Sequence, residues 1–276
     1  MDHVRMAKRF NLAVFLAVAT VVLTMTGCGV LNNGRGWGED AIYPVDLKRV
    51  SHAAYHAFFD LETLIPAAGA LVFTLDDYDQ KVSTWATAQY PIFGSGNNAI
   101  QARDYLCFGL GAETLLTALA TPSGEHPKEW ASNKMRGIGV ELGAELTTAG
   151  VTDLLKNTAN RTRPNGDSSN SFPSGHASYA FSSATLANRN LDSIEMPEKV
   201  LIPLQVGNII LATGVSWSRV EAGAHYPSDV LFGAALGHFF SAFLYDAFMG
   251  IPEHKRWGLY VSPTRGGAMI GASFGF

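Results

Sequence analysis

The stretch SFPSGHASYAFSSATLANRN, residues 171–190, joins a proline–serine–glycine–histidine turn to a run of small and apolar residues. Proline suits the first position of a helix, where its missing N–H leaves no bond unmade. The free N–H groups of such a turn can bind an anion, which Gly175 allows to approach closely. His176 would then stand beside the anion and could donate a proton to it. An ordinary helix start with a surface histidine is the alternative, so the rest of the chain must decide.

Helical periodicity recurs along most of the chain. Apolar residues are spaced as on one face of a helix in five further segments. Together with 175–190, the predicted helices are 60–75, 99–121, 134–157, 199–218 and 228–249. This pattern predicts an all-α fold, a helical bundle of about six core helices. Residues 256–276 instead alternate apolar and small residues after a Pro/Gly turn, which predicts a short C-terminal β-hairpin packed on the domain.

The first 27 residues have the pattern of a secretory signal peptide. Basic residues precede the apolar run LAVFLAVATVVLTM at 12–25, and MTGC ends at Cys28. This resembles a bacterial lipoprotein signal, in which cleavage leaves Cys28 as a lipidated N-terminus. An uncleaved membrane anchor is the alternative, although such an apolar run is short for a span. Residues 28–50, rich in Gly and Asn, are predicted to tether the lipid to a helical domain over 51–255.

Composition limits the partners. The chain is 47% hydrophobic and 16% charged, and its formal net charge is −4. With no basic stripe, no nucleic acid partner is expected. Residues 200–218 lack charge and could span a membrane, but most other helices carry acidic residues that are costly at a bilayer centre. We therefore expect a globular helical domain that the N-terminal lipid holds at the membrane.

Two further groups of polar residues flank the opening stretch. Lys156 and Arg163 are seven residues apart, which leaves about 20° of net rotation in a helix, so both cations share one face. Downstream, Arg219 and His225 precede a helix that Pro227 can open. Asp229 lies in its first turn, where the carboxylate can accept a hydrogen bond from a ring nitrogen of the histidine. Three cations, two histidines and one carboxylate are the components of a phosphate-binding site that could also catalyse.

In this order, the three groups resemble the three-part signature of the type 2 phosphatidic acid phosphatase superfamily. The signature reads Lys156-x6-Arg163-Pro164, then Pro173-Ser174-Gly175-His176, then Ser218-Arg219-x5-His225-x3-Asp229. The superfamily has a helical-bundle fold, and it also contains bacterial non-specific acid phosphatases, lipid phosphate phosphatases and vanadium haloperoxidases. Residues 50–150 match no motif.

The resemblance implies a role for each residue of the signature. His225 would be the nucleophile that forms a phosphohistidine, with Asp229 polarising it. His176 would protonate the leaving oxygen and later activate water. No metal or other cofactor is implied, because fixed cations and amides can neutralise the phosphoryl charge. The phosphoryl group would be bound by Lys156, Arg163, Ser174, Gly175 and Arg219.

The sequence thus predicts a metal-independent phosphatase for phosphate monoesters or diphosphates. The substrate would be a phosphorylated lipid, a polyprenyl phosphate or a small soluble phosphoester. There are two alternatives. One is a vanadium-dependent haloperoxidase, which would bind vanadate at the same residues, and the other is a non-catalytic outer-membrane lipoprotein. The predicted location is the bacterial cell envelope, at the outer membrane facing the periplasm.

Two other features predict no chemistry: Arg161 is interpreted as a surface cation, and the acidic run DDYD (76–79) as a solvated helix end.

Overall fold

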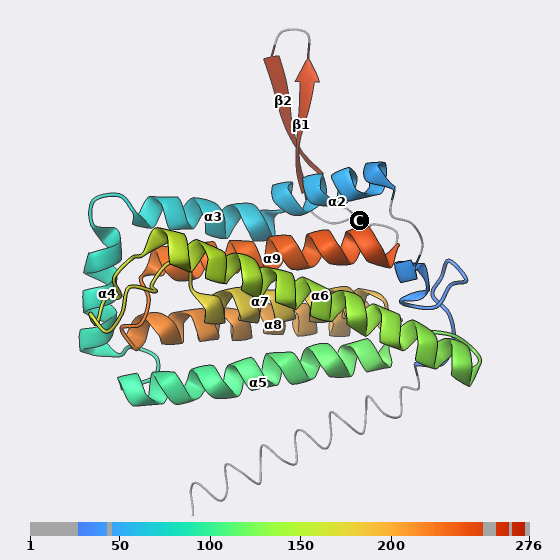
Figure 1. Cartoon of the computed structure of the whole chain (residues 1–276), viewed down its shortest axis with the longest axis horizontal. Helices are drawn as coiled ribbons and strands as arrows, with labels where there is room; N and C mark the ends of the chain where they lie inside the picture. Colours follow the sequence, from blue (N-terminus) through green and yellow to red (C-terminus); the bar gives the residue numbers. More distant parts are fainter. Residues whose placement is uncertain (1–26, 43–45, 251–257, 265–266, 274–276) are drawn as a thin grey trace, which may run out of the picture.

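A computed structural model describes residues 27–42, 46–250, 258–264 and 267–273. In these ranges the long helices lie side by side, and a short one, α4, lies across one end of them (Figure 1). Four of the described helices begin at a side-chain cap, such as the Ser95 side chain of α5 accepting from the N–H of Asn98. The elements are η1 (Glu39–Ile42), α2 (Leu47–Phe59), α3 (Leu61–Phe73), α4 (Tyr78–Gln89), α5 (Gly96–Ala120), α6 (Pro127–Ala159), α7 (Gly175–Asp192), α8 (Glu198–Glu221), α9 (Pro227–Met249), β1 (Gly258–Thr264) and β2 (Gly267–Ser273).

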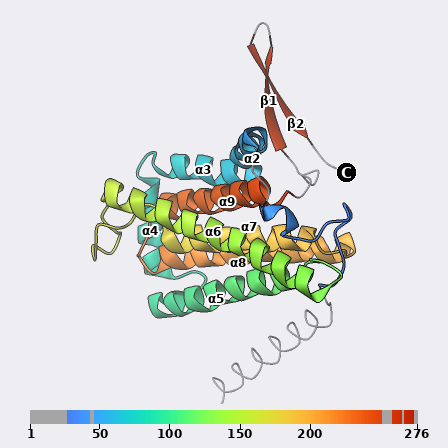
Figure 2. The same ribbon diagram turned by 45° about the vertical axis from the view of Figure 1, so that its right-hand side comes forward.

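The helical class fits the prediction, but the predicted arrangement is wrong in two respects. The described residues form eight α-helices, not about six, because α2 and α4 were missed. Helix α4 buries only Asp79, Ser83 and Ala86, so it has no apolar stripe that periodicity could detect. The expected hairpin packed on the domain is not part of the bundle: β1 and β2 pair with each other and project away from the helices in both views (Figures 1 and 2).

Helix α7 forms the centre of the bundle and packs against α5, α6, α8 and α9. It buries small residues along its length, among them Ala177, Ala180 and Ala184. On α9, a Cβ added to Gly237 would lie 2.2 Å from the carbonyl oxygen of Ser178. The two backbones can therefore approach closely only because small residues face each other, and this approach brings the N-termini of α7 and α9 together.

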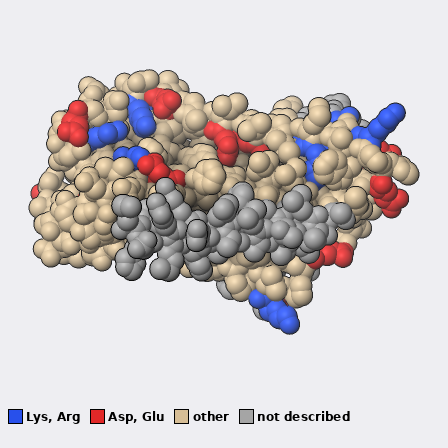
Figure 3. All heavy atoms as spheres, turned by 90° about the horizontal axis from the view of Figure 1, so that it is seen from below, with Lys and Arg blue, Asp and Glu red and all other residues tan. Residues whose placement is uncertain are grey.

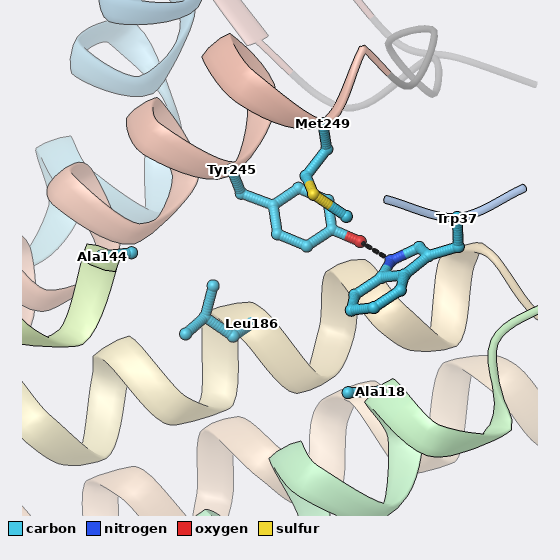
Figure 4. Packing of buried hydrophobic residues seen from close by; sticks show 6 residues of the cluster. All are labelled: Trp37, Ala118, Ala144, Leu186, Tyr245 and Met249. Atoms are coloured by element: carbon cyan, nitrogen blue, oxygen red, sulfur yellow. Dashed lines mark hydrogen bonds between the residues drawn. The ribbon is translucent and has the colours of Figure 1, made fainter. Parts of the chain in front are cut away.

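The segment before α2 docks on the bundle. Trp37 is fully buried, and its indole Nε1 donates a hydrogen bond of 2.8 Å to the Tyr245 hydroxyl (Figure 4). Gly29 forms an isolated β-bridge with Gly124. Within the predicted tether, the segment around Trp37 lies against the core, because burying the indole holds this part of the chain there. The predicted signal peptide falls almost entirely within residues 1–26, which lie outside the described ranges, and Cys28 is exposed.

Two of the described helices, α8 and α9, are long and apolar enough to cross a membrane by length and composition. They differ in burial: 56% of the apolar window of α9 is buried inside the bundle, but only 22% of that of α8. On the face that Figure 3 shows, much of the surface outside the grey atoms is formed by residues other than Lys, Arg, Asp and Glu. Such exposed apolar surface is typical of a site that contacts lipid or another protein. On α8 it consists of Val200, Ile202, Leu204, Val206 and Ile210.

Candidate active site

The helix ends that carry the signature residues lie at the end of the bundle where α4 lies (Figure 1). Lys156 is in the last turn of α6, and Arg219 is in the last turn of α8. His176 is in the first turn of α7, and His225 lies just before α9. Helix N-termini carry free N–H groups and a partial positive charge, both of which favour an anion. Residues up to seventy positions apart in the sequence thus meet at one anion-binding end.

The start of α7 is built as a cradle. Ser174 is the N-cap residue, and its hydroxyl accepts from the N–H of Ala177 at 3.5 Å. Its own N–H donates to the carbonyl oxygen of Asp229 at 3.0 Å, which ties the cradle to α9. A Cβ added to Gly175 would lie 3.0 Å from the Nζ of Lys156. The ammonium group therefore lies directly against this glycine, beside the first turn of α7.

The cations of the site are crowded and short of partners. The Nε atoms of Arg163 and Arg219 are buried and make no hydrogen bond within the described ranges. Burial, together with the charges of Arg103 and Arg163, lowers the pKa of Arg219 to about 10. Burial also lowers the pKa of Lys156, although Asp153 opposes this. An anion placed among these groups would relieve their mutual repulsion.

Arg103 is a cation of this site that the sequence analysis missed. It lies on α5, outside every motif, and its guanidinium group hydrogen-bonds to the neighbouring Asp104 at 2.6 Å. Its charge lowers the pKa of both Arg219 and His176. No sequence signal could have found it, because only the packing of α5 against α7 and α8 brings it to this end of the bundle.

His176 is neutral in the free protein at neutral pH. Burial lowers its pKa to about 3, and the charges of Arg219 and Arg103 add to this effect. The charge of His225 also lowers the pKa of His176, since the two imidazoles share the site. A bound dianion would act in the opposite direction and favour the protonated ring.

His225 is held by a backbone carbonyl. Its Nδ1 lies 2.7 Å from the carbonyl oxygen of Ser171. Because a carbonyl oxygen only accepts, Nδ1 carries the proton and Nε2 is left with its lone pair free. Asp229 Oδ2 is 3.8 Å from Nδ1, too far for the direct hydrogen bond that the spacing suggested. Burial lowers the pKa of His225, against the nearby negative charge of Asp229.

Asp229 is fully buried and nevertheless ionised. Its carboxylate accepts from the Ser171 hydroxyl at 2.5 Å, from the N–H of Tyr226 at 2.8 Å and from Arg161 Nη1 at 2.7 Å. Burial alone would raise the pKa of Asp229, but the contacts with His225, Ser171 and Arg161 outweigh it and lower the pKa. Ser171 was also missed: it joins the two groups by accepting from the imidazole and donating to the carboxylate.

The structure corrects two interpretations from the sequence: Arg161 is not a free surface cation, and the DDYD segment is not fully solvated. Arg161 makes ion pairs with Asp79 at 2.8 Å and with Asp229 at 2.7 Å. Asp79 is only 6% exposed, whereas Asp76 and Asp77 are exposed as expected. In the described part of the chain, no group of three or more His, Cys, Asp or Glu side chains is arranged to hold a metal ion.

Comparisons with known proteins match the part of the chain that carries these residues. The family model described as the PAP2 superfamily matches residues 140–251, which include the whole signature. A lipid A 1-phosphatase from Porphyromonas gingivalis is 36% identical over 96 residues, 35% of this chain and 20% of that protein. A decaprenylphosphoryl-5-phosphoribose phosphatase from Mycobacterium tuberculosis is 31% identical over 140 residues, 48% of this chain and 67% of that protein.

The helices and signature therefore define a phosphoric ester hydrolase by class, and the chain belongs to the PAP2 superfamily. The match spans only a fifth (20%) of the lipid A 1-phosphatase. A solved structure, the transmembrane PAP2 type phosphatidylglycerolphosphate phosphatase from Bacillus subtilis, is 21% identical with a TM-score of 0.49. That comparison covers 72% of this chain and 94% of the other.

Proposed function

We propose that this protein is a metal-independent phosphatase that cleaves a lipid or polyprenyl phosphate through a phosphohistidine at His225. The observation that carries the proposal is that two histidines and two arginines come to one end of the bundle, and that the buried Nε atoms of Arg163 and Arg219 have no hydrogen-bond partner in the described ranges. Guanidinium groups without a carboxylate partner are suited to a phosphoryl group, which they bind through paired N–H donors.

The geometry supports a two-step reaction. With the cations holding the non-bridging oxygens, the free Nε2 of His225 attacks phosphorus and the bond from phosphorus to the leaving oxygen breaks. His176 donates its proton to that leaving oxygen. In the second step neutral His176 takes a proton from water, the water oxygen attacks phosphorus, and the phosphorus–Nε2 bond breaks. Asp229 stabilises the positive charge that His225 acquires on attack, through its charge rather than through a hydrogen bond.

A lipid substrate is favoured over a small soluble ester by the surface of the bundle. The exposed apolar side chains of α8 would lie against lipid, and two helices have the length and composition to cross a membrane. The relatives named above are phosphatases of lipid A and of a decaprenyl phosphosugar. A membrane location is therefore supported, and an N-terminal lipid on Cys28 at the outer membrane is part of the proposal.

A substrate panel tests the activity. Purified protein with EDTA is given lipid A, a polyprenyl diphosphate, phosphatidic acid and a soluble alkyl phosphate, and released phosphate is measured. We expect release from at least one lipid phosphate, faster than from the soluble ester and unaffected by EDTA. Release from none of these substrates, or release only after a divalent metal is added, would contradict the proposal.

The anchor is tested by fatty-acid labelling of growing cells. Cys28→Ala should abolish labelling and leave an uncleaved precursor, while Cys107→Ala serves as the control because its thiol is half-buried within α5. Labelling that survives the change at Cys28 would refute the lipid anchor.

A further inference from the structure

We infer that Asp79 and Arg161 are positioning residues that hold the Asp229–His225 pair in its reactive arrangement. The inference rests on the proposed phosphatase function. It assigns a role in the reaction to α4, which lies outside the matched residues 140–251. Neither residue belongs to the signature, and both act through Asp229 rather than on the substrate.

Asp79 joins α4 to the first turn of α9. Its Oδ1 accepts from the N–H of Ser228 at 2.8 Å, and its Oδ2 accepts from the Ser228 hydroxyl. The first N–H groups of a helix have no partner within the helix, so this carboxylate caps α9 from a different element. The turn that it fixes carries Asp229 and directly follows His225. A shift of α4 would therefore be transmitted to the nucleophile.

Arg161 lies between two carboxylates. Its Nη2 donates to Asp79 at 2.8 Å, while its Nη1 donates to Asp229 at 2.7 Å and to the Ser228 hydroxyl at 2.8 Å. The guanidinium carbon also stands 4.2 Å from the centre of the Tyr226 ring, the residue next to His225. These donors are engaged by protein groups, which distinguishes Arg161 from Arg163 and Arg219, whose buried Nε atoms make no hydrogen bond in the described part of the chain. A planar fork can bridge two carboxylates in this way, whereas a lysine ammonium group cannot reproduce its geometry.

The charge arrangement makes the inference testable by pH. His225 can attack only when Nε2 is unprotonated, so the acidic limb of kcat/KM reports its pKa in the free enzyme. Removing the negative charge of Asp79 lowers that pKa, while removing the positive charge of Arg161 exposes His225 to two carboxylates and raises it. The charged and titratable groups around His225 are Asp229 on α9, Arg219 on α8, His176 on α7, Asp79 on α4, Arg161 after α6, and Lys156 and Arg163 on the phosphate side.

The test compares Asp79→Asn and Arg161→Gln with the matched control Asp77→Asn. Asp77 is exposed, makes no capping bond, and has a left-handed φ of 57° that asparagine accepts readily. We expect the acidic limb of kcat/KM to move to lower pH in Asp79→Asn and to higher pH in Arg161→Gln, by about half a pH unit or more in each case. The pH profile of kcat/KM for the control Asp77→Asn should superimpose on that of the wild type. Arg161→Lys should leave the acidic limb of kcat/KM at the wild-type pH, because lysine retains the positive charge. It should nevertheless lower kcat, because lysine lacks the planar guanidinium group that bridges the two carboxylates.

Histidine NMR separates this inference from the proposed function. The imidazole of His225, assigned by its loss in His225→Ala, is titrated in the same variants without substrate. If the wild type cleaves no phosphate ester, the proposed function fails, while opposite shifts of the His225 pKa would still support the positioning role. Shifts of the same sign, or no shift in either variant with the folded state verified by circular dichroism, would overturn it. If Arg161→Gln does not fold, Asp79→Asn should lower the pKa of His225, while Arg161→Lys should leave that pKa unchanged and lower kcat; an unchanged pKa in Asp79→Asn or a wild-type kcat in Arg161→Lys would overturn the positioning role.

Discussion

Binding of an anion in the cradle should raise the pKa of His176 from about 3 to at least about 6. A leaving-group acid must be protonated when the substrate is bound, yet burial and the nearby cations keep this ring neutral in the free protein. Raising its pKa by three units requires about 4 kcal/mol. A dianion about 4 Å away provides about 8 kcal/mol at an effective dielectric constant of 20, so half of that interaction suffices.

Sulfate is the appropriate probe, because it carries two negative charges throughout the titration and has no proton of its own to exchange. Protein labelled with ¹⁵N-histidine is titrated from pH 8 to pH 5, with saturating sulfate and with sodium chloride at equal ionic strength. The resonance that is lost in His176→Ala identifies the ring. We expect it to stay neutral in chloride and to become protonated in sulfate, with the midpoint near pH 6.

By linkage, sulfate should bind more tightly as the pH falls, by up to about tenfold per pH unit below that midpoint. Calorimetry at pH 5 in two buffers of different ionisation enthalpy should therefore detect proton uptake on binding. A His176 pKa below about 5 in saturating sulfate would leave about one ring in a hundred protonated at pH 7, and the role of His176 as the acid would be refuted.

Three further predictions concern the histidines and the packing. His225→Ala should abolish turnover of every ester, whereas His176→Ala should lower kcat/KM, which reports release of the leaving group, about 10²–10⁴-fold with an alkyl phosphate and much less with p-nitrophenyl phosphate, whose leaving group needs no proton; equal losses of kcat/KM on both substrates would contradict these roles. Gly237→Ala should destabilise the fold by about 1–3 kcal/mol, since the new Cβ would lie 2.2 Å from a backbone oxygen, and calorimetry should show a lower Tm than for Gly139→Ala, where nothing lies within 4 Å. For His238, burial is outweighed by the negative charges of Asp60 and Glu62, whose carboxylates lie 3.4 Å and 3.1 Å from its ring nitrogens and raise its pKa to about 9. Protonated His238 therefore adds to the free energy of unfolding; this contribution is fully present below about pH 6.5 and is lost as the pH rises through about 9. The free energy of unfolding, measured with denaturant, should fall over this pH range in the wild type but not in His238→Asn.

The helices that the sequence predicted are mostly long and rich in apolar residues, whereas the missed helix α2 is short, although its apolar residues are more strictly confined to one face than those of α5 or α9. The segments predicted at 99–121 and 228–249 correspond to α5 and α9 within a few residues. Helix α4 was missed because most of its surface is exposed and the residues that it buries are small or polar. Trp37 was assigned to a tether because its neighbours are glycines and asparagines, and only the pocket formed by α6, α7 and α9 explains its burial.

The sequence by itself predicted the class of chemistry, since Lys156, His176 and His225 stand near prolines and glycines that can start or end helices. These are local features, and local steric and hydrogen-bonding preferences act over a few residues. The tertiary structure alone decided which distant groups join them: Asp79 from α4, Arg161 between two carboxylates, and the carbonyl of Ser171 against His225. The physical reason is that isolated charges signal solvent exposure in a sequence, whereas packing can bury them in pairs, and such pairing depends on contacts between residues far apart in the chain.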